Sequence, residues 1–195
     1  MSLMPCFKSG EAFDEGVILG RLLAGYGELE LQMCSCLIAA EGTLDRPIKV
    51  IFGKTGAERR IKIVERALKT DFTNAGLLPD LMQALTDLNW CRKIRNQYSH
   101  CHWYWTTREG LCFVNLQELP KHTAMIMSLT TNMHSIDVPL LTAQEDYFWY
   151  VKECFMYLES AYRAWDQARS RGSAPGPPIH IYPKPAAKTP PPKHN

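Results

Sequence analysis

Apolar residues recur at helical spacing along most of the chain, roughly every three to four positions, as in helices with one buried face. Two helix starts carry further signals. Asp45 precedes Pro47, and Thr142 begins a capping-box pattern that ends at Glu145, both of which suit the first turn of a helix. The pattern therefore predicts helices over residues 11–41, 45–52, 57–71, 78–101 and 142–169. In the third of these, Ile61, Val64 and Leu68 are expected to face inward, and in the first the recurring apolar positions are Phe13, Val17, Leu19 or Leu22, Tyr26, Leu29, Met33 and Leu37.

One stretch departs from this spacing. Trp103, Tyr104 and Trp105 are aromatic, and the β-branched Thr106 and Thr107 follow them before a turn at residues 108–110. Residues 111–116 then return to a composition typical of strands. These features predict an all-α fold, a helical bundle, with one small β-hairpin inserted near residues 102–117.

The C-terminal segment has a different composition from the rest. Eight of the 13 prolines follow Gly172, and proline supports neither helix interiors nor sheet ladders. We therefore expect a helical domain over residues 1–171 and a disordered, partly polyproline tail over residues 172–195. Residues 171–195 carry four basic residues and no acid: Arg171, Lys184, Lys188 and Lys193. The net charge of the whole chain is +2, so the other 170 residues carry a net charge of 18 − 20 = −2.

Composition also bears on the cellular setting. No apolar stretch approaches the roughly 18–20 residues that a membrane span requires, so no membrane association is expected. Seven cysteines without a Cys-x-x-Cys pair are typical of a reducing compartment, which predicts a cytoplasmic protein. His100 and His102 flank Cys101, but a second ligand pair at suitable spacing is missing from the sequence, so neither a metal nor another cofactor is predicted.

The helix predicted over residues 78–101 has a polar face opposite its apolar positions Ile94 and Tyr98. That face gathers two guanidinium groups, an amide, a hydroxyl and an imidazole, from Arg92, Arg95, Asn96, Ser99 and His100. An imidazole can move the proton of a ribose 2′-hydroxyl, and arginine can hold a phosphate. Because a 2′-hydroxyl is an internal nucleophile, this chemistry needs no metal. Composition alone favours a plainer interpretation, an ordinary solvated helix face.

The segment Arg95-Asn96-Gln97-Tyr98-Ser99-His100 resembles the Arg-polar-x-x-x-His motif of HEPN domains (higher eukaryotes and prokaryotes nucleotide-binding). The resemblance implies a HEPN-like helical bundle and a metal-independent endoribonuclease that cleaves RNA by 2′-hydroxyl attack. It also implies a homodimer and a biological role as a toxin, with an antitoxin partner, or as a phage-defence effector.

Specific roles follow from this resemblance. Arg95 would bind the scissile phosphate, His100 would act as general base or acid, and Asn96 would orient His100 or the substrate. Arg92 and Ser99 share the same face and are expected to contact the substrate. A supporting acid from an earlier helix is also expected, and the sequence offers Glu28 or Glu30 without selecting between them.

The helix geometry favours a dimer for a separate reason. Arg95 and His100 lie about 140° apart around one helix, so two copies are needed to bring an arginine and a histidine to the same phosphate. One alternative is a non-catalytic HEPN-like module that binds a nucleotide or a protein through this face. Another is a helical scaffold whose partner binds the proline-rich tail.

Overall fold

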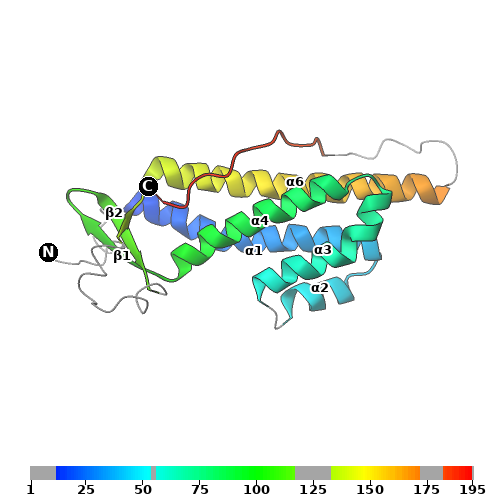
Figure 1. Cartoon of the computed structure of the whole chain (residues 1–195), viewed down its shortest axis with the longest axis horizontal. Coiled ribbons are helices and arrows are strands. Elements are labelled where there is room, and N and C mark those ends of the chain that lie inside the picture. The colour runs from blue at the N-terminus through cyan, green and yellow to red at the C-terminus, as the bar shows by residue number, and fades with distance from the viewer. Residues whose placement is uncertain (1–11, 54–55, 117–132, 172–181, 195) are drawn as a thin grey trace. The chain divides into compact units, whose positions relative to one another are not determined.

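The computed structural model describes residues 12–53, 56–116, 133–171 and 182–194 (Figure 1). Most of these residues are helical, and a small three-stranded antiparallel sheet accompanies the helices. The helices are α1 (Phe13–Glu41), α2 (Asp45–Phe52), α3 (Ala57–Asn74), α4 (Leu78–Ser99) and α6 (Val138–Arg171). The strands are β1 (Cys101–Thr106), β2 (Gly110–Asn115) and β3 (His134–Ser135).

The chain divides into two compact units. Unit 1 contains the residues up to Tyr26, Cys91–Tyr147 and those from Thr189 onward. Unit 2 contains Gly27–Trp90 and Phe148–Lys188. The long helices α1, α4 and α6 each contribute residues to both units, which is why hydrophobic spacing along single helices gives no sign of the division.

Unit 2 is a helical assembly with a well-filled apolar core. The predicted inward positions of α3 are confirmed, since Ile61, Val64 and Leu68 are all buried. The ring of Phe72 stacks on that of Tyr162 with centroids 5.0 Å apart. The remaining buried core side chains include Met33, Leu37, Ile51, Leu81, Leu88, Phe155 and Leu158.

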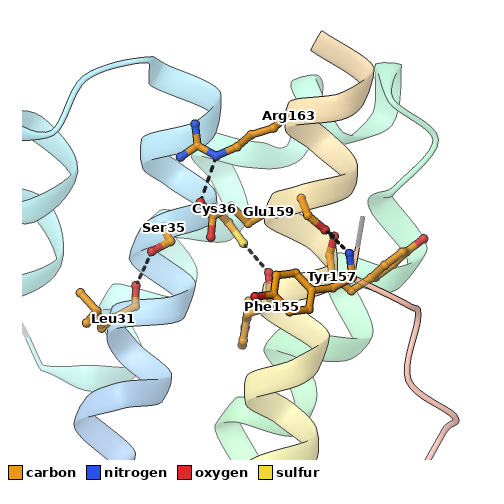
Figure 2. Close-up of polar contacts among 9 residues, drawn as sticks. Leu31, Ser35, Cys36, Phe155, Tyr157, Glu159 and Arg163 are labelled. Carbon is orange, nitrogen blue, oxygen red and sulfur yellow. Dashed lines mark hydrogen bonds and ion pairs between the residues drawn. The ribbon is translucent and has the colours of Figure 1, made fainter. Parts of the chain in front are cut away.

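One polar contact joins α1 and α6 inside this core. The buried Cys36 thiol donates to the Phe155 carbonyl at 3.5 Å (Figure 2). Burial raises the pKa of Cys36 far above its ordinary value, so the thiol stays protonated and acts as a small apolar group. The described cysteines, including this one, are free thiols.

In unit 1, only some of the predicted apolar positions in the first turns of α1 are buried. Leu22 and Tyr26 are buried, whereas Phe13 is 70% exposed and Val17 is 40% exposed. Val17 lies about 180° around the helix from Tyr26, because nine residues at 100° each bring it to the opposite side. The predicted inward positions of Phe13 and Val17 are therefore wrong.

The predicted hairpin is confirmed. β1 pairs antiparallel with β2, and Trp103 lies opposite Phe113. Gly110 has φ +71°, a left-handed conformation that suits glycine in the turn. The short strand β3, which the sequence pattern does not predict, pairs with β2 through Cys112 and Ser135. On one side of the sheet, Trp103 packs with ring centroids 5.5 Å from Tyr98 and 5.1 Å from Phe113.

Two helix boundaries differ from the prediction for local reasons. α4 ends at Ser99 rather than Cys101, because Cys101 already pairs with Asn115 in the hairpin. α6 begins at Val138 rather than Thr142. Its cap is Asp137, whose carboxylate accepts a hydrogen bond from the Leu140 amide at 2.9 Å, as N-cap residues do.

Part of the proline-rich tail makes defined contacts. Residues 182–194 form no helix or strand, yet they make specific contacts, and residues 172–181 lie outside the described part of the chain. Because proline has no backbone N–H, such a segment offers mainly carbonyl oxygens for hydrogen bonding. Side-chain donors of the helices meet these carbonyls, as described below. Within the described residues, no helix has the length and apolar character to cross a membrane.

Candidate functional site

The last turns of α4 orient the predicted catalytic face through their buried residues. Ile94 and Tyr98 are buried at 0% and 2% exposure, as their spacing predicts. The opposite side of the helix therefore faces outward. Arg92, Arg95 and Asn96 are half-buried, while Ser99 and His100 are exposed.

Arg95 is held in place by two neighbours in unit 1. Its Nη1 donates to the Asn96 side-chain oxygen at 2.9 Å. Its guanidinium also lies over the Tyr26 ring, 5.5 Å from the centroid, a cation–π geometry. Arg95 and Asn96 are thus brought together, and Asn96 orients the arginine rather than His100 in this arrangement.

His100 occupies the turn between α4 and β1. Its backbone carbonyl accepts a hydrogen bond from the Leu116 amide at 3.0 Å, which fixes the backbone at the base of the hairpin. The imidazole itself is exposed. Ser99 beside it donates from its hydroxyl to the Asn96 carbonyl at 3.1 Å, a local contact typical of a helix end.

The two acids proposed to support the motif have other ionic partners. Glu30 is buried at 7% exposure and accepts from Arg60 at 2.7 Å. Glu28 pairs with Lys152 at 2.8 Å. These four residues all belong to unit 2, and the two ion pairs connect α1 to α3 and to α6. Both acids therefore have a structural role in joining helices.

Next to the motif, unit 1 contains a cavity of about 360 Å³. Two motif residues, Asn96 and Gln97, line it, and the buried Phe113 ring forms part of its wall. None of the described residues that line the cavity is acidic. Its other lining residues are polar or basic and come from α4, β2, β3 and the C-terminal segment: Lys93, Asn115, His134, Lys193 and His194.

A buried amide holds the C-terminal segment at this cavity. Gln144 of α6 is 0% exposed and donates from Nε2 to the Pro192 carbonyl at 2.7 Å. Its Oε1 accepts from the Tyr98 hydroxyl at 2.6 Å. The Tyr98 oxygen also lies 3.0 Å from the Lys193 carbonyl, so its single proton serves one acceptor at a time.

Tyr98 is suited to this role as a donor. Burial is the main reason that the pKa of its hydroxyl is raised well above the ordinary value, although the hydrogen bond to Gln144 opposes the shift. The hydroxyl therefore keeps its proton throughout the neutral range. Tyr98 thus links the motif helix to the tail, a connection that the hydrophobic spacing of α4 does not reveal.

The basic cavity is not predicted from the sequence, because four separate segments build it. The nearest sequence signal is local: from Leu88 to Arg108 the chain holds four basic residues and no acidic one. Among the described residues, no group of three histidines, cysteines or acids is placed to hold a metal ion. His102 is exposed on β1, and its ring stacks on Tyr104 with centroids 6.4 Å apart.

Comparisons with protein-family models, with curated proteins and with solved structures find no match to this chain.

Proposed function

We propose that the protein is a HEPN-type endoribonuclease that cleaves RNA without a metal. The observation that carries the proposal is the end of α4. There Arg95 is oriented by Asn96 and Tyr26, and His100 presents an exposed imidazole one turn and a half further along. The acid-free sequence from Leu88 to Arg108 supports this, because it favours a polyanion at this end of the helix.

The proposed reaction is an internal transfer at phosphorus. His100 takes the proton of the ribose 2′-hydroxyl, and the 2′ oxygen forms a bond to phosphorus as the bond from phosphorus to the 5′ oxygen breaks. A second, protonated imidazole donates a proton to the leaving 5′ oxygen. Arg95 and Arg92 stabilise the charge that develops on the phosphate. The products are a 2′,3′-cyclic phosphate and a 5′-hydroxyl.

A homodimer supplies the second imidazole and solves a spacing problem. From Arg95 to the end of α4 at Ser99 the helix rises about 6 Å, and His100 follows in the turn after it. A two-fold arrangement brings the histidine of one copy to the arginine of the other.

The test is cleavage of end-labelled RNA by the purified full chain in EDTA. We expect His100→Ala to lower the rate by about 10²- to 10⁴-fold, the usual contribution of general acid–base catalysis. His102→Ala is the matched control, because His102 is also exposed but lies on β1 outside the motif. Wild-type cleavage that leaves cyclic phosphate ends supports the proposal, whereas equal rates for the two variants would contradict it.

A second candidate is a non-catalytic HEPN-like module that binds a nucleotide or a partner protein, such as an antitoxin. The position of Arg95 favours it, because the guanidinium already contacts Tyr26 and Asn96 and so has a structural role. This candidate predicts that folded wild-type protein leaves RNA intact in the same assay. A role in toxin–antitoxin or phage-defence systems rests on the family resemblance alone.

A further inference from the structure

The end of the C-terminal segment is bound through its backbone by side chains of α4 and α6. Gln144 donates from Nε2 to the Pro192 carbonyl at 2.7 Å and to the Lys193 carbonyl at 3.2 Å. The Lys193 carbonyl also accepts from Gln97 at 3.5 Å and lies 3.0 Å from the Tyr98 hydroxyl. All five residues belong to unit 1. The side chains of Gln97, Tyr98 and Gln144 together form a carbonyl clamp around two consecutive residues.

The carbonyl clamp is held in place by the core of unit 1. Gln144 is 0% exposed and Tyr98 is 2% exposed. The Tyr98 hydroxyl lies 2.6 Å from Oε1 of Gln144, an acceptor, so Nε2 of the same amide is directed at the segment. The Tyr98 ring packs with its centroid 5.5 Å from that of Trp103 and 5.7 Å from that of Phe113. These donors are therefore oriented by the fold, which lowers the entropic cost of binding a ligand.

The bound segment itself has the character of a ligand on a surface. It forms no helix or strand, and Thr189, Pro190 and Pro192 are exposed. In each of its contacts with the carbonyl clamp, the segment supplies a carbonyl acceptor and the clamp supplies the donor. Proline has no backbone N–H and favours an extended polyproline conformation. A run of prolines therefore presents carbonyls to such donors without bringing N–H groups that need partners of their own.

From these observations we infer that the carbonyl clamp is a binding site for proline-rich peptides, occupied in this structure by the chain's own tail. The contacts use backbone carbonyls, which every proline-rich segment shares, and recognition of extended proline-rich segments is a common mode of peptide binding. This inference goes beyond the proposed ribonuclease and does not depend on it.

The occupant that we assign is a proline-rich segment of another protein, which displaces the tail. The tail of a second copy offers only the same contacts as the chain's own tail. A covalently attached segment acts at an effective concentration of the order of millimolar, so an identical segment from a second copy is at a disadvantage. A segment of another protein can replace the tail because it can add contacts that the tail does not make.

The test is fluorescence anisotropy with a labelled peptide of residues 189–194. The protein is the full chain with glycine in place of Pro190, Pro191 and Pro192, because glycine keeps the carbonyls but loses more entropy when it is ordered. We expect the peptide to bind this variant. Adding Gln144→Leu should weaken binding by about tenfold or more, because the hydrogen bonds to two carbonyls are lost. Adding Thr142→Leu is the matched control, since Thr142 is exposed on the same helix.

A second measurement uses the unmodified chain and so does not depend on how the variants fold. Unlabelled peptide is added to isotope-labelled wild type, and the backbone amide signals of Lys193 and His194 are followed by NMR. We expect millimolar peptide to move both signals toward their positions in the free peptide, because it competes with the attached tail. A peptide with alanine at the three proline positions should move them less.

Three results would overturn the inference. The first is that the NMR signals stay unchanged, which would make the tail a permanent part of the fold. The second is that Gln144→Leu and Thr142→Leu have equal effects on peptide binding. The third is a wild-type dimer that Gln144→Leu dissociates, which would assign the carbonyl clamp to the tail of a second copy instead of another protein.

Discussion

The C-terminal segment contributes to two cavities of contrasting chemistry, one in each unit. In unit 1 it adds Lys193 and His194 to a lining whose described residues include no acid. In unit 2 a cavity of about 180 Å³ is lined by the tail residues Lys184, Pro185 and Ala187 together with residues of α4 and α6. There the lysine is neutralised, because its Nζ lies 2.7 Å from the Asp80 carboxylate. The same segment therefore contributes a paired lysine to one cavity and a lysine and a histidine to the other.

The pKa shifts of two side chains in the unit 2 cavity add to this contrast. Burial raises the pKa of Tyr150 to about 12 and that of Cys154 to about 11. Both side chains line the unit 2 cavity and stay uncharged at neutral pH. The hydrogen bond to Asp80 raises the pKa of Lys184, which keeps the ion pair intact. The unit 2 cavity thus has neutral walls and a paired lysine, which suits packing, whereas the described lining of the unit 1 cavity is mostly polar and basic.

Among the variants that test this contrast between the cavities, Gln144→Leu should lower the free energy of unfolding the most. The substitution removes the buried amide that binds the Pro192 carbonyl and the Tyr98 hydroxyl, and it leaves both groups without that partner. We expect the free energy of unfolding to fall by about 1–3 kcal/mol, the usual cost of leaving a buried polar group unsatisfied. Urea denaturation of the full chain measures this loss.

Release of the tail gives a second measurement for the same variant. Trypsin can cleave after Lys188, and Gln144→Leu should speed this cleavage because the segment that follows is no longer bound. Thr142→Leu is the control, since Thr142 is exposed on the same helix. If Gln144→Leu leaves both stability and cleavage at the level of Thr142→Leu, the buried amide does not hold the tail.

The contacts between Gln144 and the tail also show which features of the fold cannot be predicted from the sequence. The hydrophobic spacing of α4 correctly predicted its helix and the burial of Ile94 and Tyr98, because a single helix sets that periodicity. It failed for Val17, since the exposed and buried sides of α1 both carry apolar residues. The Gln144 contacts join residues 46 to 49 positions apart, and no local pattern encodes such a pairing.

Likewise, only one part of the candidate site can be recognised in the sequence. The motif from Arg95 to His100 lies within one helix end and is visible in the sequence. The cavity next to it is not visible, because Lys93, Asn115, His134 and His194 meet only after the hairpin, β3 and the tail are in place. The composition of the tail does not indicate its contacts either, because its carbonyls accept hydrogen bonds from side chains that only the tertiary structure brings together.

A pH experiment tests the neutral character of the unit 2 cavity. Burial raises the pKa of Cys154 from 9.0 to about 11, so below pH 9 folded and unfolded thiols are both protonated. Between pH 9 and pH 11 the unfolded thiol ionises while the folded thiol keeps its proton, and the free energy of unfolding falls. Urea denaturation across this range should show a smaller fall for Cys154→Ala than for wild type. Equal falls would mean that Cys154 is not kept neutral by the fold.

The smallest effect should come from Lys184→Gln, which removes the ion pair with Asp80 on the unit 2 side. The side chains of Lys184 and Asp80 are 61% and 27% exposed, and such pairs contribute about 0–1 kcal/mol. We expect a loss within that range, measured by urea denaturation against Lys188→Gln, that diminishes further in high salt because mobile ions screen exposed charges. The Gln144→Leu loss should change little with salt, since it comes from buried hydrogen bonds. If Lys184→Gln costs as much as Gln144→Leu, the tail is held mainly in unit 2 and the assignment of different roles to the two cavities is wrong.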